Sequence, residues 1–253
     1  EARYLLLRGL LGNRTSNYFD GNLGRLKSLG LDAEEIPIDT EGRRRADLRA
    51  VEQAVLASPK PVVLIGHSRG GMLAHDWYRR ASPELKSKIA RLVTIQSPLH
   101  GTPLADERVS TWWGRMKIYW VGKLLFGEET FRISVELTTR VRRRVLASLP
   151  PWTPEDLEKT YAVRSVIQFI ERHPYHKTAH SLLTRLGAPD NDGRIPTDSA
   201  RIAGAHELLL LDVNHDNIVV QNPGWFKRLL GARPNPRFDS GDFTEALVRR
   251  LFR

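Results

Sequence analysis

The stretch 61–71, which reads P-V-V-L-I-G-H-S-R-G-G, decides the fold predicted for this chain. Its first five residues form a continuous apolar run with β-branched side chains, which predicts a buried strand. The run leads into a G-x-S-x-G pattern centred on Ser68, and residues 72–80 read as a helix. A tight strand-to-helix turn lifts the serine hydroxyl above the sheet, and a side chain at Gly66 or Gly70 would collide with neighbouring backbone. Ser68 is therefore a candidate nucleophile; the alternative is a glycine-rich turn with a structural serine.

Short apolar runs alternate with helix-like segments on both sides of this stretch. Residues 19–26 and 48–55 carry apolar side chains at helical spacing, and residues 242–252 do so near the end of the chain. The alternation predicts an α/β fold with a mostly parallel sheet of about six strands and helices on both faces. The strands that can be named are 4–7, 33–38, 61–65, 91–95 and 207–213.

A second motif follows the strand at 91–95. Residues 96–106 read Q-S-P-L-H-G-T-P-L-A-D. With the G-x-S-x-G turn they resemble bacterial triacylglycerol lipases and related esterases, in which a P-x-x-G-T/S-P-L-A-D segment follows the same strand. The resemblance implies the α/β-hydrolase fold, with a nucleophilic serine followed along the chain by an acid and then a histidine.

Two later segments supply the acid and the base. Residues 188–196, A-P-D-N-D-G-R-I-P, resemble the N-D-G-x-V/I-P segment of those lipases. This assigns the acid to Asp192, with Asp190 as the first substitute and Asp198 as a distant third; a plain D-N-D-G turn is the alternative. His215 follows the last predicted strand in an N-H context, as the base does in the resembled family, and would exchange a proton with the serine.

The other histidines fit the role of base less well. His67 is too close in sequence to fold back onto the serine, and His75 belongs to the helix after it. His206 precedes the last predicted strand and should lie at its wrong end. His100 follows the strand at 91–95 and is expected to line the substrate pocket.

The tetrahedral intermediate of acyl transfer needs two backbone N–H donors, the oxyanion hole. Arg69, directly after the serine, is one expected donor. Residues 8–12, R-G-L-L-G, resemble the H-G-x-x-G loop of the lipases, which makes Leu10 the other. Arg8 stands where the family has a histidine, but the N–H geometry does not depend on that side chain. The strand before this loop is the first in the chain, which suggests a minimal version of the fold.

Residues 104–160 break the strand–helix rhythm. They are aromatic and basic, which predicts a cap or lid inserted at about 104–160 into a single domain spanning 1–253. The aromatic residues form either an acyl-binding wall or the small core of the insertion itself. The arginine-rich run 140–144 is expected to be a solvated helix face. The expected substrate-binding residues are Trp112, Trp113, Trp120 and His100.

No cofactor and no metal site is predicted. The histidines at 173, 176 and 180 have spacing seen in metal sites, but Glu171 is the one nearby carboxylate. Some resembled lipases hold a structural calcium through an aspartate two residues beyond the catalytic histidine. Here the aspartate, Asp216, is directly adjacent to that histidine and position 217 is Asn, so calcium is not expected.

Composition limits the class and the partners. The 253 residues carry a net charge of +10, are 41% hydrophobic and contain no cysteine. This excludes disulfides and a cysteine nucleophile. No apolar run reaches the roughly 20 residues that span a membrane. The charge suits an anionic interface, but no nucleic-acid motif accompanies it, so nucleic acid is not an expected partner. No secretory signal is visible, and either a cytoplasmic or a secreted location is compatible with these features.

These features together predict a serine hydrolase acting on small-molecule or lipid esters, an esterase or lipase. A thioesterase, a polyester depolymerase, an amidase or an acyltransferase would use the same three residues. An inactive hydrolase-fold binding protein is the alternative outside the enzymes. Against it stands the simultaneous presence of serine, acid, histidine and oxyanion glycine in the right order.

Overall fold

The computed structural model describes residues 1–15, 17–110, 129–224, 228–229 and 231–252. Within these residues, six strands form one sheet in which every neighbouring pair is parallel, in the order β2-β1-β3-β4-β5-β6. The predicted α/β architecture with about six parallel strands is confirmed. The strands are β1 Arg3–Leu7, β2 Asp32–Glu35, β3 Val62–His67, β4 Ile89–Ile95, β5 Thr160–Val166 and β6 His206–Leu211.

Side-chain alternation along the strands builds two apolar cores, one on each face of the sheet. In β1, Tyr4 and Leu6 contribute to one core, and Leu5 and Leu7 contribute to the other. A strand covered on both faces is apolar at successive positions, which is why the central strands read as continuous apolar runs in the sequence.

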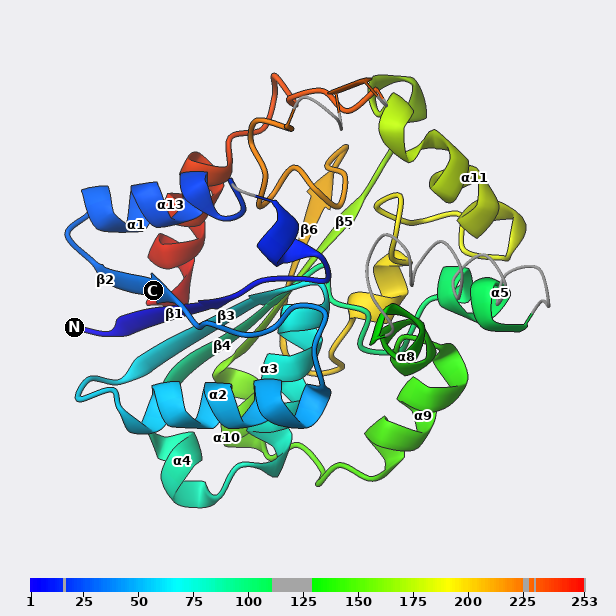
Figure 1. Cartoon of the computed structure of the whole chain (residues 1–253). Coiled ribbons are helices and arrows are strands. Elements are labelled where there is room, and N and C mark those ends of the chain that lie inside the picture. Colours follow the sequence, from blue (N-terminus) through cyan, green and yellow to red (C-terminus); the bar gives the residue numbers. More distant parts are fainter. Residues whose placement is uncertain (16, 111–128, 225–227, 230, 253) are drawn as a thin grey trace.

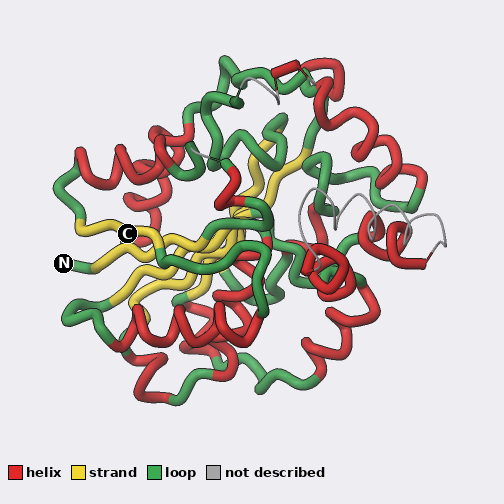
Figure 2. The backbone as a smooth tube through the Cα atoms, viewed as in Figure 1, coloured by secondary structure: helices red, strands yellow, loops and turns green. Residues whose placement is uncertain are grey.

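Helices form the outer layers on both faces (Figures 1 and 2). Helices α1 (Asp20–Ser28) and α13 (Ser240–Leu251) pack against each other on one face. Helices α2 (Arg44–Leu56) and α3 (Arg69–Arg80) pack on the other. The remaining described helices are α4 Pro83–Ser87, α5 Pro103–Ser110, α8 Glu129–Glu136, α9 Thr139–Ala147, α10 Pro154–Glu158 and α11 Lys177–Arg185, with the 3-10 helices η1 Gly12–Arg14, η3 Ile170–Arg172, η4 Pro174–His176 and η5 Thr197–Ala200.

Strand β5 is the element that the sequence patterns did not name. It follows the aromatic and arginine-rich region, and Arg164 interrupts its apolar run. In the sheet, Arg164 forms an ion pair with Glu207 of the neighbouring strand β6 at 2.6 Å, so a carboxylate on β6 compensates its positive charge. Strand β2 is also shorter than predicted, because it ends at Glu35 and not at residue 38.

The region predicted as a cap contains α5, α8, α9 and α10, and residues 111–128 within it lie outside the described residues. In Figure 1, α5, α8 and α9 lie beyond the carboxyl ends of the central strands, on the side where β1 and β3 terminate. Among the helices that the structure describes, none is both long and apolar enough to span a membrane.

Candidate active site

Ser68 lies in the turn between β3 and α3, in a backbone conformation that side chains seldom adopt. Its φ is 54° and its ψ is −124°, a region that costs on the order of 1–3 kcal/mol for a residue other than glycine. The turn is held by the bond from the Ser68 N–H to the Ile95 carbonyl (2.8 Å) and by α3, whose Met72 N–H donates to the Ser68 carbonyl (3.1 Å). Gln96 and Asp212, which directly follow β4 and β6, also have positive φ values of 45° and 55°. Backbone strain therefore gathers at the carboxyl ends of the strands, where the candidate residues meet.

The glycines of this turn are required by space, as predicted. A Cβ atom on Gly66 would lie 2.4 Å from the Cα of Gly71, and one on Gly70 would lie 2.4 Å from the Leu7 carbonyl oxygen. Gly71 is equally constrained, since its Cβ would lie 2.0 Å from Ser97 Oγ. The turn thus packs its backbone directly against β1 and the loop after β4.

The structure brings Ser68, His215 and Asp192 together although they come from three distant loops. His215 Nε2 lies 3.0 Å from Ser68 Oγ, and His215 Nδ1 lies 2.8 Å from Asp192 Oδ2. Asp192 and His215 are both buried, while Ser68 is partly accessible. The arrangement is one in which a carboxylate orients an imidazole toward a hydroxyl.

Asp192 is held in place by hydrogen bonds with the backbone. Its Oδ1 accepts the N–H groups of Arg194 (2.9 Å) and Ile195 (2.7 Å), and its carbonyl accepts the His215 N–H (2.9 Å). The alternatives Asp190 and Asp198 are both exposed, and Asp198 lies near Arg164 at 3.5 Å. The geometry therefore favours Asp192 among the three carboxylates.

The loop after β1 passes directly beside the serine. A Cβ atom on Gly9 would lie 2.9 Å from Ser68 Cβ, so only glycine permits this approach. Arg8 braces the loop, because its guanidinium donates to the carbonyls of Gly12 (3.0 Å) and Thr15 and to Glu35 of β2. Within the described residues, neither the Leu10 N–H nor the Arg69 N–H donates to another backbone or side-chain group.

The remaining candidate histidines lie away from the serine hydroxyl or are engaged elsewhere. His75 is buried in α3 and bonds Asp76 (2.8 Å). His206 begins β6, at the amino end of the strand, and stacks on Tyr161 with 4.5 Å between ring centroids. Both ring nitrogens of His67 are engaged, with Tyr18 on one side and with Gln96 and the carbonyl of His215 on the other.

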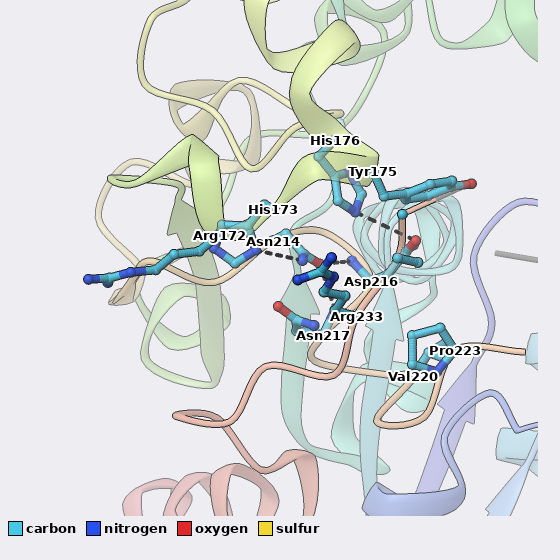
Figure 3. Close-up of a pocket in the computed structure, with 12 residues that line it drawn as sticks. Arg172, His173, Tyr175, His176, Asn214, Asp216, Asn217, Val220, Pro223 and Arg233 are labelled. Carbon is cyan, nitrogen blue, oxygen red and sulfur yellow. Dashed lines mark hydrogen bonds and ion pairs between the residues drawn. The ribbon is translucent and has the colours of Figure 1, made fainter. Parts of the chain in front are cut away.

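Two of the histidines with metal-like spacing, His173 and His176, line a small cavity together with Asn214 and Asp216 (Figure 3). His176 faces Asp216 at 3.7 Å, and His173 bonds Asn214 at 2.9 Å, around a cavity of ≈ 20 Å³. Burial lowers the pKa of His176 to about 3. Over the part of the chain that the structure describes, no group of histidine and acidic side chains is arranged to hold a metal ion.

The predicted substrate-binding residues are only partly described. Trp112, Trp113 and Trp120 lie outside the described residues. His100 is exposed and borders a groove of ≈ 830 Å³ that Leu99, Trp152 and Arg201 also line.

One sequence expectation about the arginine run needs correction. Residues 140–144 were expected to form a solvated face, but Arg142 is completely buried. Its guanidinium bonds both carboxylate oxygens of Asp76 on α3, at 2.6 and 2.9 Å, and the carbonyl of Leu99. The physical reason is that the Arg142 side chain extends from α9 to a buried carboxylate on α3, which no spacing within the run reveals.

Part of the chain matches a known family model. Residues 48–142 match a family described as a PGAP1-like alpha/beta domain. This range begins in α2, contains the turn at Ser68 and ends in α9. No curated protein matches the chain at a significant level.

Solved structures match this fold to different extents. A metagenomic carboxyl esterase superposes with a TM-score of 0.78 and 17% sequence identity, over 99% of this chain and 75% of that one. A gene product of Listeria innocua reaches a TM-score of 0.48 at 14% identity, over 99% and 94% of the two chains. A thioesterase of prodiginine biosynthesis from Streptomyces coelicolor reaches 0.42 at 19% identity, over 90% and 88%. The likeness to the carboxyl esterase and the observed sheet show that the chain has the α/β-hydrolase fold, as predicted.

Proposed function

We propose that this α/β-hydrolase-fold chain is a serine hydrolase that cleaves carboxylic esters through an acyl-enzyme on Ser68. The observation that carries the proposal is the continuous hydrogen-bonded chain Ser68 Oγ–His215 Nε2 (3.0 Å) and His215 Nδ1–Asp192 Oδ2 (2.8 Å). It is supported by the strained turn that presents the hydroxyl. The fold shared with a carboxyl esterase is consistent with this reaction.

In the first half-reaction, Ser68 Oγ attacks the ester carbonyl while His215 Nε2 takes the hydroxyl proton. Asp192 accepts the Nδ1–H bond, fixes the tautomer of the ring and stabilises the imidazolium that forms. When the tetrahedral intermediate collapses, the bond between the carbonyl carbon and the alcohol oxygen breaks. The alcohol leaves with the proton that His215 returns, and the acyl group stays on Ser68.

The negative charge of the intermediate falls on the former carbonyl oxygen. We assign its stabilisation to the backbone N–H groups of Leu10 and Arg69, which have no intramolecular acceptor in the described structure. The close approach of Gly9 to Ser68 supports this assignment, because it brings the loop after β1 next to the reacting carbon. In the second half-reaction, His215 activates a water molecule that releases the acid from Ser68.

The insertion at about 104–160 is proposed as the wall of the acyl site. This part of the proposal rests on the place of α5 and α8 beyond the carboxyl ends of the central strands. The same three residues would serve a thioester or polyester substrate, so the nature of the ester is the part that needs measurement.

The test is hydrolysis of p-nitrophenyl esters from acetate to palmitate by the wild type and by Ser68→Ala. We expect Ser68→Ala to lose on the order of 10⁴ to 10⁶ in kcat. The chain-length optimum separates an esterase from a lipase. Equal rates for the two proteins, together with no labelling of Ser68 by a fluorophosphonate, would contradict the proposal and favour an inactive binding protein.

A further inference from the structure

We propose that Tyr18 and His67 are positioning residues. Through one chain of hydrogen bonds they hold the oxyanion loop (residues 8–12) and the backbone of His215 in a fixed relative position. The inference rests on the proposed function and assigns roles to two residues that the reaction itself does not consume. Tyr18 lies in the loop before α1, and His67 is the last residue of β3, directly before the nucleophile. Both side chains are buried.

The chain of hydrogen bonds begins at the oxyanion loop. The Gly9 N–H donates to Tyr18 Oη at 2.8 Å, and Tyr18 Oη lies 2.5 Å from His67 Nδ1. Gly9 is adjacent to Leu10, the proposed oxyanion donor, so the Tyr18 hydroxyl fixes the peptide next to that donor.

The chain of hydrogen bonds ends at the candidate base. The direction of donation along it follows from the partners of His67 Nε2. This nitrogen lies 3.1 Å from Gln96 Oε1 and 3.0 Å from the His215 carbonyl oxygen. The Gln96 amide nitrogen donates to Ser165 Oγ and to the Asn214 carbonyl, which leaves its oxygen facing His67. Both partners of Nε2 are therefore acceptors, so Nε2 carries the proton.

It follows that Nδ1 of His67 has no proton and accepts the Tyr18 hydroxyl. The Tyr18 oxygen is then free to accept the Gly9 N–H. All bonds run in one direction, from the Gly9 amide through Tyr18 and His67 to the His215 carbonyl, an arrangement in which each bond polarises the next.

The neutral form of His67 is compatible with catalysis. Burial and, to a smaller extent, the neighbouring His215 lower the pKa of His67 to about 3, although Gln96, Asp216 and Asp192 act in the opposite direction. The two imidazole rings lie 4.7 Å apart between centroids. A charged His67 would oppose the imidazolium that His215 must become, whereas the neutral ring supplies hydrogen bonds without this repulsion.

The chain joins the three segments that must converge on one carbonyl group, which are the oxyanion loop, the nucleophile turn and the base loop. A single oxyanion donor is worth about 10²–10³ in kcat, and a misplacement of about 1 Å costs about 10²-fold. Loosening the Arg8–Gly9 peptide, which precedes the Leu10 donor, should therefore cost about 10- to 100-fold in kcat, with little change in KM.

The experiment compares Tyr18→Phe with Tyr78→Phe. Tyr78 is also a fully buried tyrosine, but its hydroxyl donates to Asp156 (2.9 Å), on the α2–α3 face and away from the serine. For each variant we would measure kcat and KM on p-nitrophenyl butyrate, the Ki of an aliphatic trifluoromethyl ketone, and the thermal midpoint. The ketone forms a tetrahedral adduct with the serine and so reports on the oxyanion hole without turnover.

We expect Tyr18→Phe to lower kcat by about 10- to 100-fold and to raise the ketone Ki by a similar factor, with KM nearly unchanged. Tyr78→Phe should leave all three constants near the wild-type values while lowering the thermal midpoint comparably. Equal kinetic constants for the two variants would overturn the inference, because both have then lost only a structural hydrogen bond.

Variants at His67 test the two ends of the chain of hydrogen bonds separately. They also test the positioning inference if Tyr18→Phe does not fold. His67→Asn keeps an acceptor close to the Nδ1 position, and His67→Gln keeps a donor close to the Nε2 position. Both should retain more kcat than His67→Ala. Equal kcat for the three folded variants would contradict a positioning chain.

Ser68→Ala, assayed in parallel, separates the two proposals. If Ser68→Ala is inactive and Tyr18→Phe equals Tyr78→Phe, only the positioning inference fails. If Ser68→Ala is as active as the wild type, the proposed function fails, and the inference fails with it.

Discussion

Two buried polar networks flank the nucleophile turn, and they differ in charge. His67, before Ser68, joins the neutral network with Tyr18 and Gln96 on the α1–α13 side of the sheet. Arg69, after Ser68, joins an ionic network on the α2–α3 side. This ionic network consists of Arg44, Asp47, Arg69, Asp76, Glu136 and Arg142.

The ionic network contains as many acidic as basic side chains and connects four helices. Arg69 bonds Asp47 of α2 at 2.9 Å and lies 3.5 Å from Glu136 of α8. Asp76 of α3 bonds Arg142 of α9 at 2.6 Å. Burial alone would raise the pKa of Asp76, but hydrogen bonds from His75 and Arg142 outweigh it and hold the pKa below its ordinary value.

The difference indicates a division of roles around one turn. The three side chains of the neutral network, Tyr18, His67 and Gln96, bring no charge of their own next to His215. The ionic network links α8 and α9 to α2 and α3. Because each buried charge depends on its partners, the ionic side should control stability, and the neutral side should control turnover.

The largest effect should come from the carboxylate that orients His215. Asp192→Asn should reduce kcat by about 10⁴-fold, because an amide favours the wrong tautomer of the imidazole. The matched control is Asp190→Asn, two residues earlier and exposed, which should change kcat little. Steady-state kinetics on a p-nitrophenyl ester measures both, and a larger loss in the control would transfer the acid role to Asp190.

A large loss of stability should follow from breaking the ionic network. Arg142→Met leaves the buried Asp76 without its bidentate partner and should lower the free energy of unfolding by about 3 kcal/mol or more. The exposed neighbour Arg143→Met should change it by less than about 0.5 kcal/mol. Urea unfolding measures both free energies. If the loss of kcat in folded Arg142→Met, expressed as a free energy, exceeds the loss in the free energy of unfolding, the division of roles is contradicted.

Acid should destabilise the protein through two buried histidines, His67 of the neutral network and His176 outside it. Burial lowers the pKa of His67 and of His176 to about 3, below the unfolded value of about 6.5. Between these pH values the unfolded chain binds more protons than the folded chain. The contribution of the two histidines to the free energy of unfolding is therefore fully present above about pH 6.5 and is lost as the pH decreases. Each histidine should contribute a slope of about 1.4 kcal/mol per pH unit.

Urea unfolding between pH 7 and 4.5 tests this slope. The variant His176→Gln removes one of the two groups. It should reduce the slope of the free energy of unfolding against pH by the contribution of about one proton. An unchanged slope in this variant would show that His176 is protonated in the folded protein.

The smallest effect should come from ion pairs at the surface. Glu207 pairs with Arg164 at 2.6 Å and with Arg201 at 3.0 Å on the edge of the sheet. Glu207→Gln should cost less than about 1 kcal/mol, since exposed pairs are weakened by solvent and salt. A cost equal to that of Arg142→Met would remove the distinction between buried and surface pairs.

Much of the fold and the candidate triad could be predicted from local sequence. The turn at Ser68 needs small residues on both sides of the serine whatever the rest of the chain does, so its motif is short and readable. Asp192 and His215 are assigned because their segments resemble the N-D-G-x-V/I-P and N-H segments of bacterial lipases. Strand β5 lacked such a signal, because Arg164 is neutralised by a residue on another strand.

Residues that act through distant partners carried no comparable signal. Tyr18 and His67 are 49 positions apart, and His67 and His215 are 148 apart, yet they form one chain of hydrogen bonds. Arg142 belongs to a run of arginines that reads as solvated, but in the folded chain it is completely buried and bonds Asp76 of α3. No pattern within either segment distinguishes these residues from their neighbours.

The sequence by itself determined the parallel sheet and the tight turn at Ser68, because these depend on the alternation of apolar residues and on local sterics; its resemblance to bacterial lipases supplied the candidate acid and histidine. Only the tertiary structure decided which polar groups are buried together, which are charged, and which face of the turn each one occupies. The physical reason is that the free energy of a buried polar group depends on its partners, and the fold brings those partners from distant parts of the chain.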